Sequence, residues 1–157
     1  MKVECVDHIH IVVKDLDKAV RFFSELFDTT FSEALSSPAE TEGGHGVKAS
    51  VCNINGVGLE LIAPSDPNGL MAKTLKHRGE GIWAISVKVP DMDEAIAEVE
   101  SRGLRVIRRI EAGKVKEAHI HPKETYGVMI ELCEYKAQHP GVVQLLNKGY
   151  AEYEYES

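Results

Sequence analysis

The sequence predicts an α+β fold in which two βαβββ modules, related by internal duplication, form a curved mixed sheet around a cleft. Three observations support this prediction: two segments recur in the same order, each half carries the same succession of strand and helix signals, and the chain has a suitable size. Its 157 residues are enough for two small modules that share a core. With 43% hydrophobic and 27% charged residues, the composition is that of a globular protein.

The repeat consists of two pairs of similar segments. Residues 9–20 (IHIVVKDLDKAV) match residues 85–96 (ISVKVPDMDEAI) at an offset of 76 positions. Further along, residues 56–61 (GVGLEL) match residues 127–132 (GVMIEL) at an offset of 71. Two matches in the same order at nearly the same offset indicate a duplication, and the change of offset means that the loops of one module are longer.

The first module starts with a β-rich run over residues 6–13, which predicts a strand. Asp15 is suited to be the N-cap of a helix over 16–27, where apolar residues recur at mostly helical spacing. After that helix, we expect three short strands, at residues 29–35, 47–54 and 57–63.

The second module repeats this pattern. A strand is predicted over 83–89, and Asp91 with Glu94 three residues later forms the signature of a capping box. The helix over 92–102 ends at Gly103, which suits the C′ position. Three more strands are then expected, at residues 104–110, 115–121 and 127–134.

These elements divide the chain into four parts. The first module takes residues 1–64, a linker with a helix over 68–78 takes 65–80, the second module takes 81–135, and a C-terminal extension takes 136–157. The extension has a short helix signal at Pro140. The polar, Gly-rich residues 36–46 fit either a solvated connection or a lid over the cleft, and connections of this composition are the more common case.

Charge and hydrophobicity exclude several classes of protein. The net charge of −7 and the absence of one broad basic face argue against binding to nucleic acid. No apolar run approaches the ~18 residues that a membrane helix needs, and the N-terminus lacks the apolar stretch of a signal peptide. We expect a soluble, cytoplasmic protein whose three cysteines, Cys5, Cys52 and Cys133, are reduced core residues.

The repeat also selects candidate functional residues. Glu60 and Glu131 occupy equivalent places in two otherwise apolar strands, where a carboxylate is costly unless it is paired, protonated or bound to metal. His8 lies in the first strand, and its equivalent 76 positions later is Ala84. One imidazole and two carboxylates suit a divalent ion such as Co, Mn, Ni, Zn or Fe(II). Taken singly, a strand His is more often a hydrogen-bonded core residue, and a strand Glu often pairs with Arg.

Four segments carry a resemblance to a known family: VDHIHIVVKDLDKAVRFF, LELIAPSD, HRGEGIWAISVKVPDMDEAI and HPKETYGVMIEL. They resemble the vicinal-oxygen-chelate (glyoxalase, bleomycin resistance and dioxygenase) superfamily, and among its members most of all the methylmalonyl-CoA epimerases, with glyoxalase I next. The resemblance covers about residues 5–135. It implies a metal held by one residue from each of four strands, which by motif are His8, Glu60, Ala84 and Glu131.

This sequence departs from the family at the third of these positions. The family motif carries His-His where this chain has Trp83-Ala84, and alanine cannot bind a metal. Water could take the vacant position, or His10, which shares a strand face with His8, or His119 from the second module. For His10 and His119 the simpler interpretation is a polar cleft lining or a structural hydrogen bond. His121, which precedes Pro122 in a family motif, is a further candidate with either a structural role or a place in the substrate cleft.

Two functions of different classes follow. The first is an isomerase or lyase of the epimerase or glyoxalase type, in which metal assists proton transfer alpha to a carbonyl or thioester and Glu131 is both ligand and proton carrier. Its substrate would be a small molecule such as an acyl-CoA thioester. The second is a metal-free protein that binds a small molecule, with Trp83 as a stacking surface. In this fold the cleft forms within one chain or across two, so a homodimer is one of two expected arrangements.

Overall fold

The computed structural model describes residues 1–37, 46–112 and 115–136, and these form two consecutive βαβββ units. The first unit contains β1 (Cys5–Val12), α1 (Leu16–Phe27), β2 (Leu35–Ser37), β3 (Val47–Ile54) and β4 (Val57–Pro64). Helix α2 (Leu70–Arg78) follows. The second unit contains β5 (Gly81–Lys88), α3 (Met92–Ser101), β6 (Val106–Ala112), β7 (Val115–Ile120), the 3-10 turn η1 (Pro122–Glu124) and β8 (Met129–Glu134).

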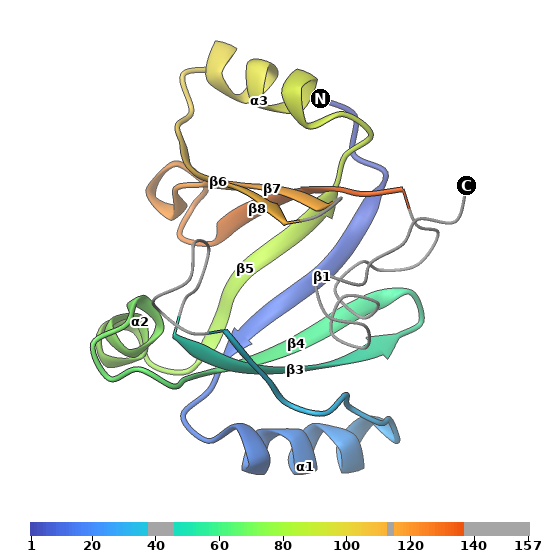
Figure 1. Ribbon diagram of the computed structural model, residues 1–157, viewed down its shortest axis with the longest axis vertical. Coiled ribbons are helices and arrows are strands. Elements are labelled where there is room, and N and C mark those ends of the chain that lie inside the picture. Colours follow the sequence, from blue (N-terminus) through green and yellow to red (C-terminus); the bar gives the residue numbers. More distant parts are fainter. Residues whose placement is uncertain (38–45, 113–114, 137–157) are drawn as a thin grey trace.

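All eight of these strands belong to one mixed, curved sheet in the order β2-β3-β4-β1-β5-β8-β7-β6. The first strands of the two units, β1 and β5, pair antiparallel at its centre, and each also pairs in parallel with the last strand of its own unit. Figure 1 shows the sheet curling between α1 and α3, which lie on opposite outer sides. This arrangement confirms the predicted fold class of two βαβββ modules.

The two faces of the sheet bury different sets of side chains because side chains alternate along each strand. On the convex face, Ile9 and Ile11 of β1 join the apolar cluster that packs against α1, with Leu61 of β4 fully buried within it. A matching cluster beneath α3 contains Leu132 of β8, also fully buried. The intervening residues of β1, β4, β5 and β8 therefore face the concave side, where the polar candidates and a third apolar cluster lie together: Val12, Val47, Ala49, Ile62, Met71, Trp83, Ala84 and Met129.

Both predicted helix starts are present. The Asp15 side chain accepts a hydrogen bond from the Lys18 backbone N–H at 3.0 Å, and Asp91 accepts one from Glu94 N–H at 2.9 Å. These bonds satisfy N–H groups that a helix leaves unpaired in its first turn. Gly103 follows α3 with a φ of +78°, the left-handed conformation that favours glycine after a helix.

Two expectations were wrong. A strand was predicted over residues 29–35, but the ladder covers Leu35–Ser37 alone. The preceding residues are anchored instead by single contacts: Phe31 is buried among apolar side chains, and the Ser32 backbone N–H donates to Val51 O at 2.8 Å. Their apolar pattern thus reflects local anchoring and not strand pairing. Cys5, the first residue of β1, is exposed, in contrast to the buried Cys52 and Cys133.

Several predictions fall outside the described residues. Most of the Gly-rich segment 36–46 and nearly all of the extension after residue 135, with its proposed helix at Pro140, belong to this group. Within the described ranges, no helix has the length and apolar character needed to cross a membrane.

Candidate metal centre

The candidate residues form two rows across the concave face. In one row, Glu60 of β4, His10 of β1 and Ala84 of β5 are direct cross-strand partners. In the other, His8 of β1 is followed across the sheet by Ser86, Glu131 and His119, which belong to β5, β8 and β7. Direct cross-strand partners point to the same side of a sheet with Cβ atoms ~5 Å apart. His8 and His10 are two residues apart on β1, so both rows face the same side.

Two β-bulges direct additional side chains toward these rows. The β1–β5 pairing passes from Val6–Val87 to His8–Ser86, which leaves Asp7 as an extra residue on β1. It then passes from His10–Ala84 to Ile11–Ile82, which leaves Trp83 as an extra residue on β5. A bulge redirects the side chain of its extra residue. Asp7 and Trp83 are themselves 76 positions apart, so the two bulges occupy equivalent places in the duplicated units.

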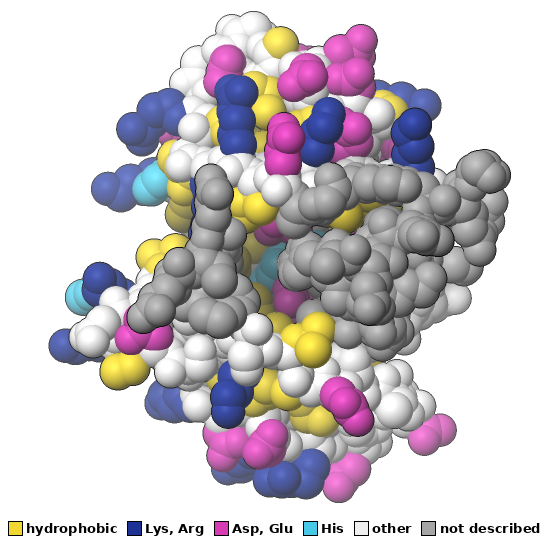
Figure 2. All heavy atoms as spheres, viewed as in Figure 1, with side chains coloured by type: hydrophobic (Ala, Val, Ile, Leu, Met, Phe, Trp, Pro, Cys, Tyr) yellow, Lys and Arg dark blue, Asp and Glu magenta, His cyan; other side chains and the backbone are white. Residues whose placement is uncertain are grey.

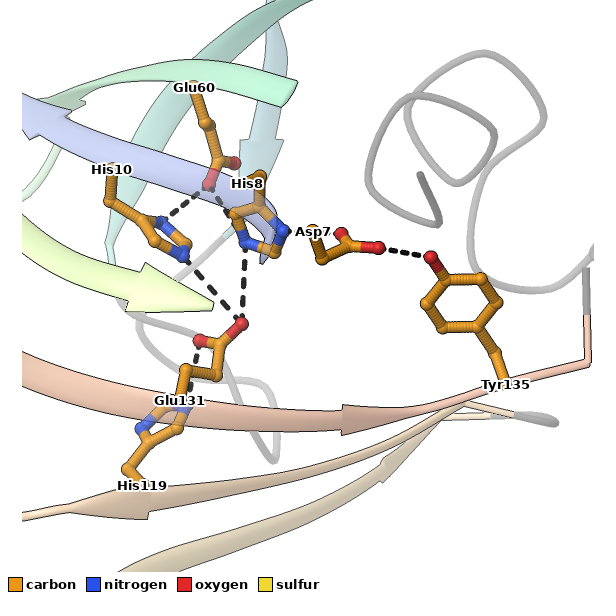
Figure 3. A network of polar contacts seen from close by, with 7 residues as sticks. All are labelled: Asp7, His8, His10, Glu60, His119, Glu131 and Tyr135. Carbon is orange, nitrogen blue, oxygen red and sulfur yellow. Dashed lines mark hydrogen bonds and ion pairs between the residues drawn. The ribbon is translucent and has the colours of Figure 1, made fainter. Parts of the chain in front are cut away.

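Three histidines surround the carboxylate of Glu131, as Figure 3 shows. Oε1 of Glu131 lies 3.3 Å from Nε2 of His8 and 3.6 Å from Nε2 of His10. Oε2 lies 3.0 Å from Nε2 of His119. Glu131 is only 3% exposed, and the other members of the group are also buried. The carboxylate thus presents one oxygen to the two histidines of β1 and the other to the histidine of β7.

The Nδ1 atoms of the two β1 histidines face two more carboxylates, those of Asp7 and Glu60. Nδ1 of His8 donates a hydrogen bond to Oδ1 of Asp7 at 2.7 Å, and Oδ2 of Asp7 accepts one from the Tyr135 hydroxyl. Nδ1 of His10 lies 2.6 Å from Oε2 of Glu60, and that same oxygen is 3.9 Å from Nε2 of His8. Each histidine is therefore held between an acid at Nδ1 and Glu131 at Nε2.

These contacts shift the proton affinities of the group strongly. Burial alone lowers the pKa of His8, but the Asp7 hydrogen bond and the negative charge of Glu131 outweigh it and raise the pKa well above its ordinary value. Burial and the His8 charge lower the pKa of His10, whereas Glu60 and Glu131 bring it up to about 9. Conversely, burial raises the pKa of Glu131, but His10 and its neighbours hold it well below the usual range. In this metal-free arrangement, His8 and His10 therefore favour the cationic form and Glu131 favours the ionised form.

The structure brings together most of the residues predicted from the sequence. His8, Glu60 and Glu131, the three predicted metal ligands, lie in one group, and His10 and His119 belong to it as well. Trp83 borders it, with its ring edge-on to His10 at a centroid distance of 5.7 Å. It is 8% exposed, which leaves little free stacking surface. His121 has a different environment, since its Nδ1 accepts a hydrogen bond from the Lys123 backbone N–H at the start of η1.

Three participants were missed by the sequence analysis. Asp7 accepts the hydrogen bond from His8, and Tyr135 donates to Asp7. Glu117 of β7 has a carboxylate oxygen within 4.8 Å of ligand atoms of His119 and Glu131. Burial and the Glu131 charge raise the pKa of Glu117 to about 8. Asp7 could have been noticed as an acid within an apolar strand next to His8. Glu117 could have been noticed because it shares a strand face with His119.

The donor set fits a divalent metal ion. One ligand atom each from His8, His10 and Glu131 lie within 4.8 Å of one another. Metal–ligand bonds of ~2.1 Å place neighbouring ligand atoms roughly 3 to 3.6 Å apart, which matches the 3.3 and 3.6 Å distances to Glu131 Oε1. Among the described residues, Nε2 of His10 and Oε1 of Glu131 are buried without a hydrogen bond, so both have free lone pairs to offer once the imidazole is neutral.

The comparison with protein families identifies the chain. The model of the Glyoxalase/Bleomycin resistance protein/Dioxygenase superfamily matches residues 7–121, which include most of β1 and all of β5. The protein belongs to this superfamily. The sequence resemblance is thereby confirmed. Figure 2 shows a hollow in one face of the molecule, with histidine and acidic side chains visible inside it.

Several relatives of this superfamily member are methylmalonyl-CoA epimerases. The mitochondrial methylmalonyl-CoA epimerase of Homo sapiens is 28% identical over 131 residues, 81% of this chain and 72% of that protein. The epimerase structure from Mycobacterium tuberculosis superposes with a TM-score of 0.72 at 27% identity, covering 90% of this chain and 93% of that one. A Streptomyces coelicolor epimerase variant, solved with 2-nitronate-propionyl-CoA, gives 0.73 at 28% identity, with coverage of 88% and 99%.

Proposed function

We propose that this protein is an isomerase that moves the proton alpha to the thioester carbonyl of an acyl-CoA such as methylmalonyl-CoA. The observation that carries the proposal is the convergence of His8, His10 and His119 on the buried carboxylate of Glu131. The relatives act on this type of substrate by name, and one was solved with methylmalonyl-CoA. A carboxylate is one of the side chains that act as general bases in proton exchange.

We further propose that the site binds a divalent metal ion from the group Co, Mn, Ni, Zn and Fe(II). His8 and Glu131 hold the ion, and Glu60, the third ligand predicted from the sequence, lies in the same group. Such an ion supplies Lewis-acid stabilisation of the negative charge that develops on the substrate oxygens. In the chain, Oε1 of Glu131 faces the β1 histidines, which leaves Oε2 to exchange a proton with the substrate carbon. Nε2 of His119, 3.0 Å from Oε2, keeps this oxygen oriented.

The proposed activity is tested by proton exchange. Incubation of methylmalonyl-CoA with the purified protein in D₂O should replace the alpha proton by deuterium, which proton NMR follows directly. We expect the exchange to stop after chelation and to return when Co(II) or Mn(II) is added. A hemithioacetal is assayed in parallel, because a glyoxalase-type isomerisation uses similar proton chemistry. Binding of the thioester without any exchange would reject the enzyme and favour the metal-free binding protein instead.

Asp7→Ala is expected to weaken metal binding about 10- to 100-fold, the usual effect of losing the partner that orients a ligating histidine. Without the Oδ1 acceptor at 2.7 Å, the His8 ring loses both its fixed orientation and its fixed tautomer. Competition with a chelating dye measures the affinity. Tyr135→Phe is the graded control: it removes the hydroxyl donor to Asp7 and keeps the carboxylate, so its effect should be smaller. An Asp7→Ala protein with unchanged affinity would mean that His8 is not a ligand.

A further inference from the structure

The vacancy at Ala84 is the starting point, because the resemblance to the superfamily implies a metal ligand at this position of β5. Ala84 is fully buried, and its β1 partner in the antiparallel register is His10. The two Cβ atoms therefore lie next to each other on the concave face. An imidazole from position 10 enters the same row of the sheet as an imidazole from position 84 would, from the adjacent strand.

We propose that His10 replaces the missing ligand at position 84, so that the metal is held by His8, His10 and Glu131, with Glu60 as the residue that positions His10. This inference rests on the proposed metal-dependent function and specifies its ligand set. Both imidazoles come from one strand, and the carboxylate comes from the other module.

The contacts of His10 support this assignment. Its Nε2 points to Oε1 of Glu131 at 3.6 Å, close to the 3.3 Å that separates the same oxygen from Nε2 of His8. Both nitrogens thus approach one oxygen at distances suited to a shared ion. The ring centroids are 4.2 Å apart with an interplanar angle of 61°, which brings the two rings together without stacking them face to face.

Glu60 relates to His10 as Asp7 relates to His8. Oε2 of Glu60 lies 2.6 Å from the Nδ1 atom of His10, on the side of the ring away from Glu131. Its distance to the ligand nitrogen of His8 is longer, at 3.9 Å. A carboxylate at the non-ligating nitrogen is the common second partner of a metal-bound histidine. Two carboxylate–histidine pairs therefore converge on Glu131.

A set of two imidazoles and one carboxylate has chemical consequences. It is the donor set of non-haem Fe(II) sites and of catalytic zinc sites, and it leaves coordination positions open for other ligands. The thioester oxygen and a second oxygen of the substrate can then bind without displacing a protein group. Trp83 lies edge-on to the His10 ring at a centroid distance of 5.7 Å.

The decisive experiment counts imidazoles on the metal. Full-length protein containing ¹⁵N-labelled histidine is loaded with Cu(II) as the probe, and pulsed EPR measures the number of coordinated imidazole nitrogens. We expect two in the unmodified protein and one in His10→Ala, together with at least a 100-fold loss of Co(II) affinity. The exposed His77 of α2 provides the matched control, and His77→Ala should retain both imidazoles.

Two further variants test the exchange of positions. The double substitution His10→Ala with Ala84→His should restore two imidazoles, since the side chain then returns from the partner strand. Glu60→Ala should keep two imidazoles and lose about 10- to 100-fold in Co(II) affinity, as expected of a positioning residue. Should His10→Ala not fold, His10→Gln and the imidazole count of the unmodified protein decide the question.

The outcomes separate this inference from the function on which it rests. One imidazole in the unmodified protein, abolished by His8→Ala and unchanged by His10→Ala, would overturn the role of His10 and leave a metal-dependent isomerase intact. Failure of the unmodified protein to bind Co(II), Mn(II), Ni(II) or Zn(II) would overturn both proposals. Metal binding with two imidazoles but no proton exchange would support the ligand set and reject the acyl-CoA isomerase.

Discussion

Glu131→Ala is expected to abolish metal binding and proton exchange together. Its carboxylate is the common neighbour of three imidazoles, at 3.3, 3.6 and 3.0 Å. Loss of an orienting partner costs about 10- to 100-fold in metal affinity, so loss of a proposed direct ligand such as Glu131 should cost more than about 100-fold. Metal content after dialysis, Co(II) titration and deuterium exchange of the substrate measure the two effects on the same sample.

Two companion variants guard against a general loss of structure. Glu131→Gln keeps the volume of the side chain and removes the charge, so it should fold and still show greatly reduced exchange. Glu124→Ala removes a carboxylate that pairs with Arg105 away from the site, and both activities should persist. Full metal occupancy in a folded Glu131→Ala protein would reject the proposed metal centre.

Leu61→Ala and Leu132→Ala should each destabilise the protein by about 3 to 5 kcal/mol, the cost of a large cavity in a core that cannot collapse. Both side chains are fully buried, one under α1 and the other under α3. They are 71 positions apart and thus equivalent in the duplicated units. We expect similar losses in the free energy of unfolding, measured by urea denaturation of the metal-free protein.

Leu26→Ala supplies the comparison for these core variants. Leu26 lies on α1 and is 58% exposed, so its truncation should change the free energy of unfolding by less than about 0.5 kcal/mol. A large loss for Leu61→Ala combined with a negligible one for Leu132→Ala would mean that the two units do not unfold as one cooperative body, although a continuous sheet joins them.

Much of the fold could be predicted because the repeat supplied the same information twice. The helix over 16–27 was predicted at its observed bounds, since Asp15 marks its start and apolar spacing marks its face. The prediction of a strand over 29–35 was wrong because hydrophobic residues can be buried by isolated contacts as well as by pairing of their segment in a sheet. Propensity describes which residues prefer burial, and the tertiary structure decides how the backbone is paired.

The site was predictable in part for a similar reason. His8, Glu60 and Glu131 stood out as polar residues in apolar strands, and the structure places them in one group. The parts played by Asp7 and Trp83 depend on two bulges, and a bulge is a property of how two strands pair, which the sequence of either strand alone does not reveal. The approach of His10 to Ala84 depends on the same register.

The antiparallel pairing of β1 with β5 also affects how such a site can evolve. If the same fold were assembled from two identical chains with one module each, every substitution would occur in both modules. A chain that contains both copies is free to alter one side alone. A histidine can then be lost from β5 while β1 gains one. The site keeps the same number of imidazoles, although its two halves no longer match. The adjacency of His10 and Ala84 is the geometry that such an exchange requires.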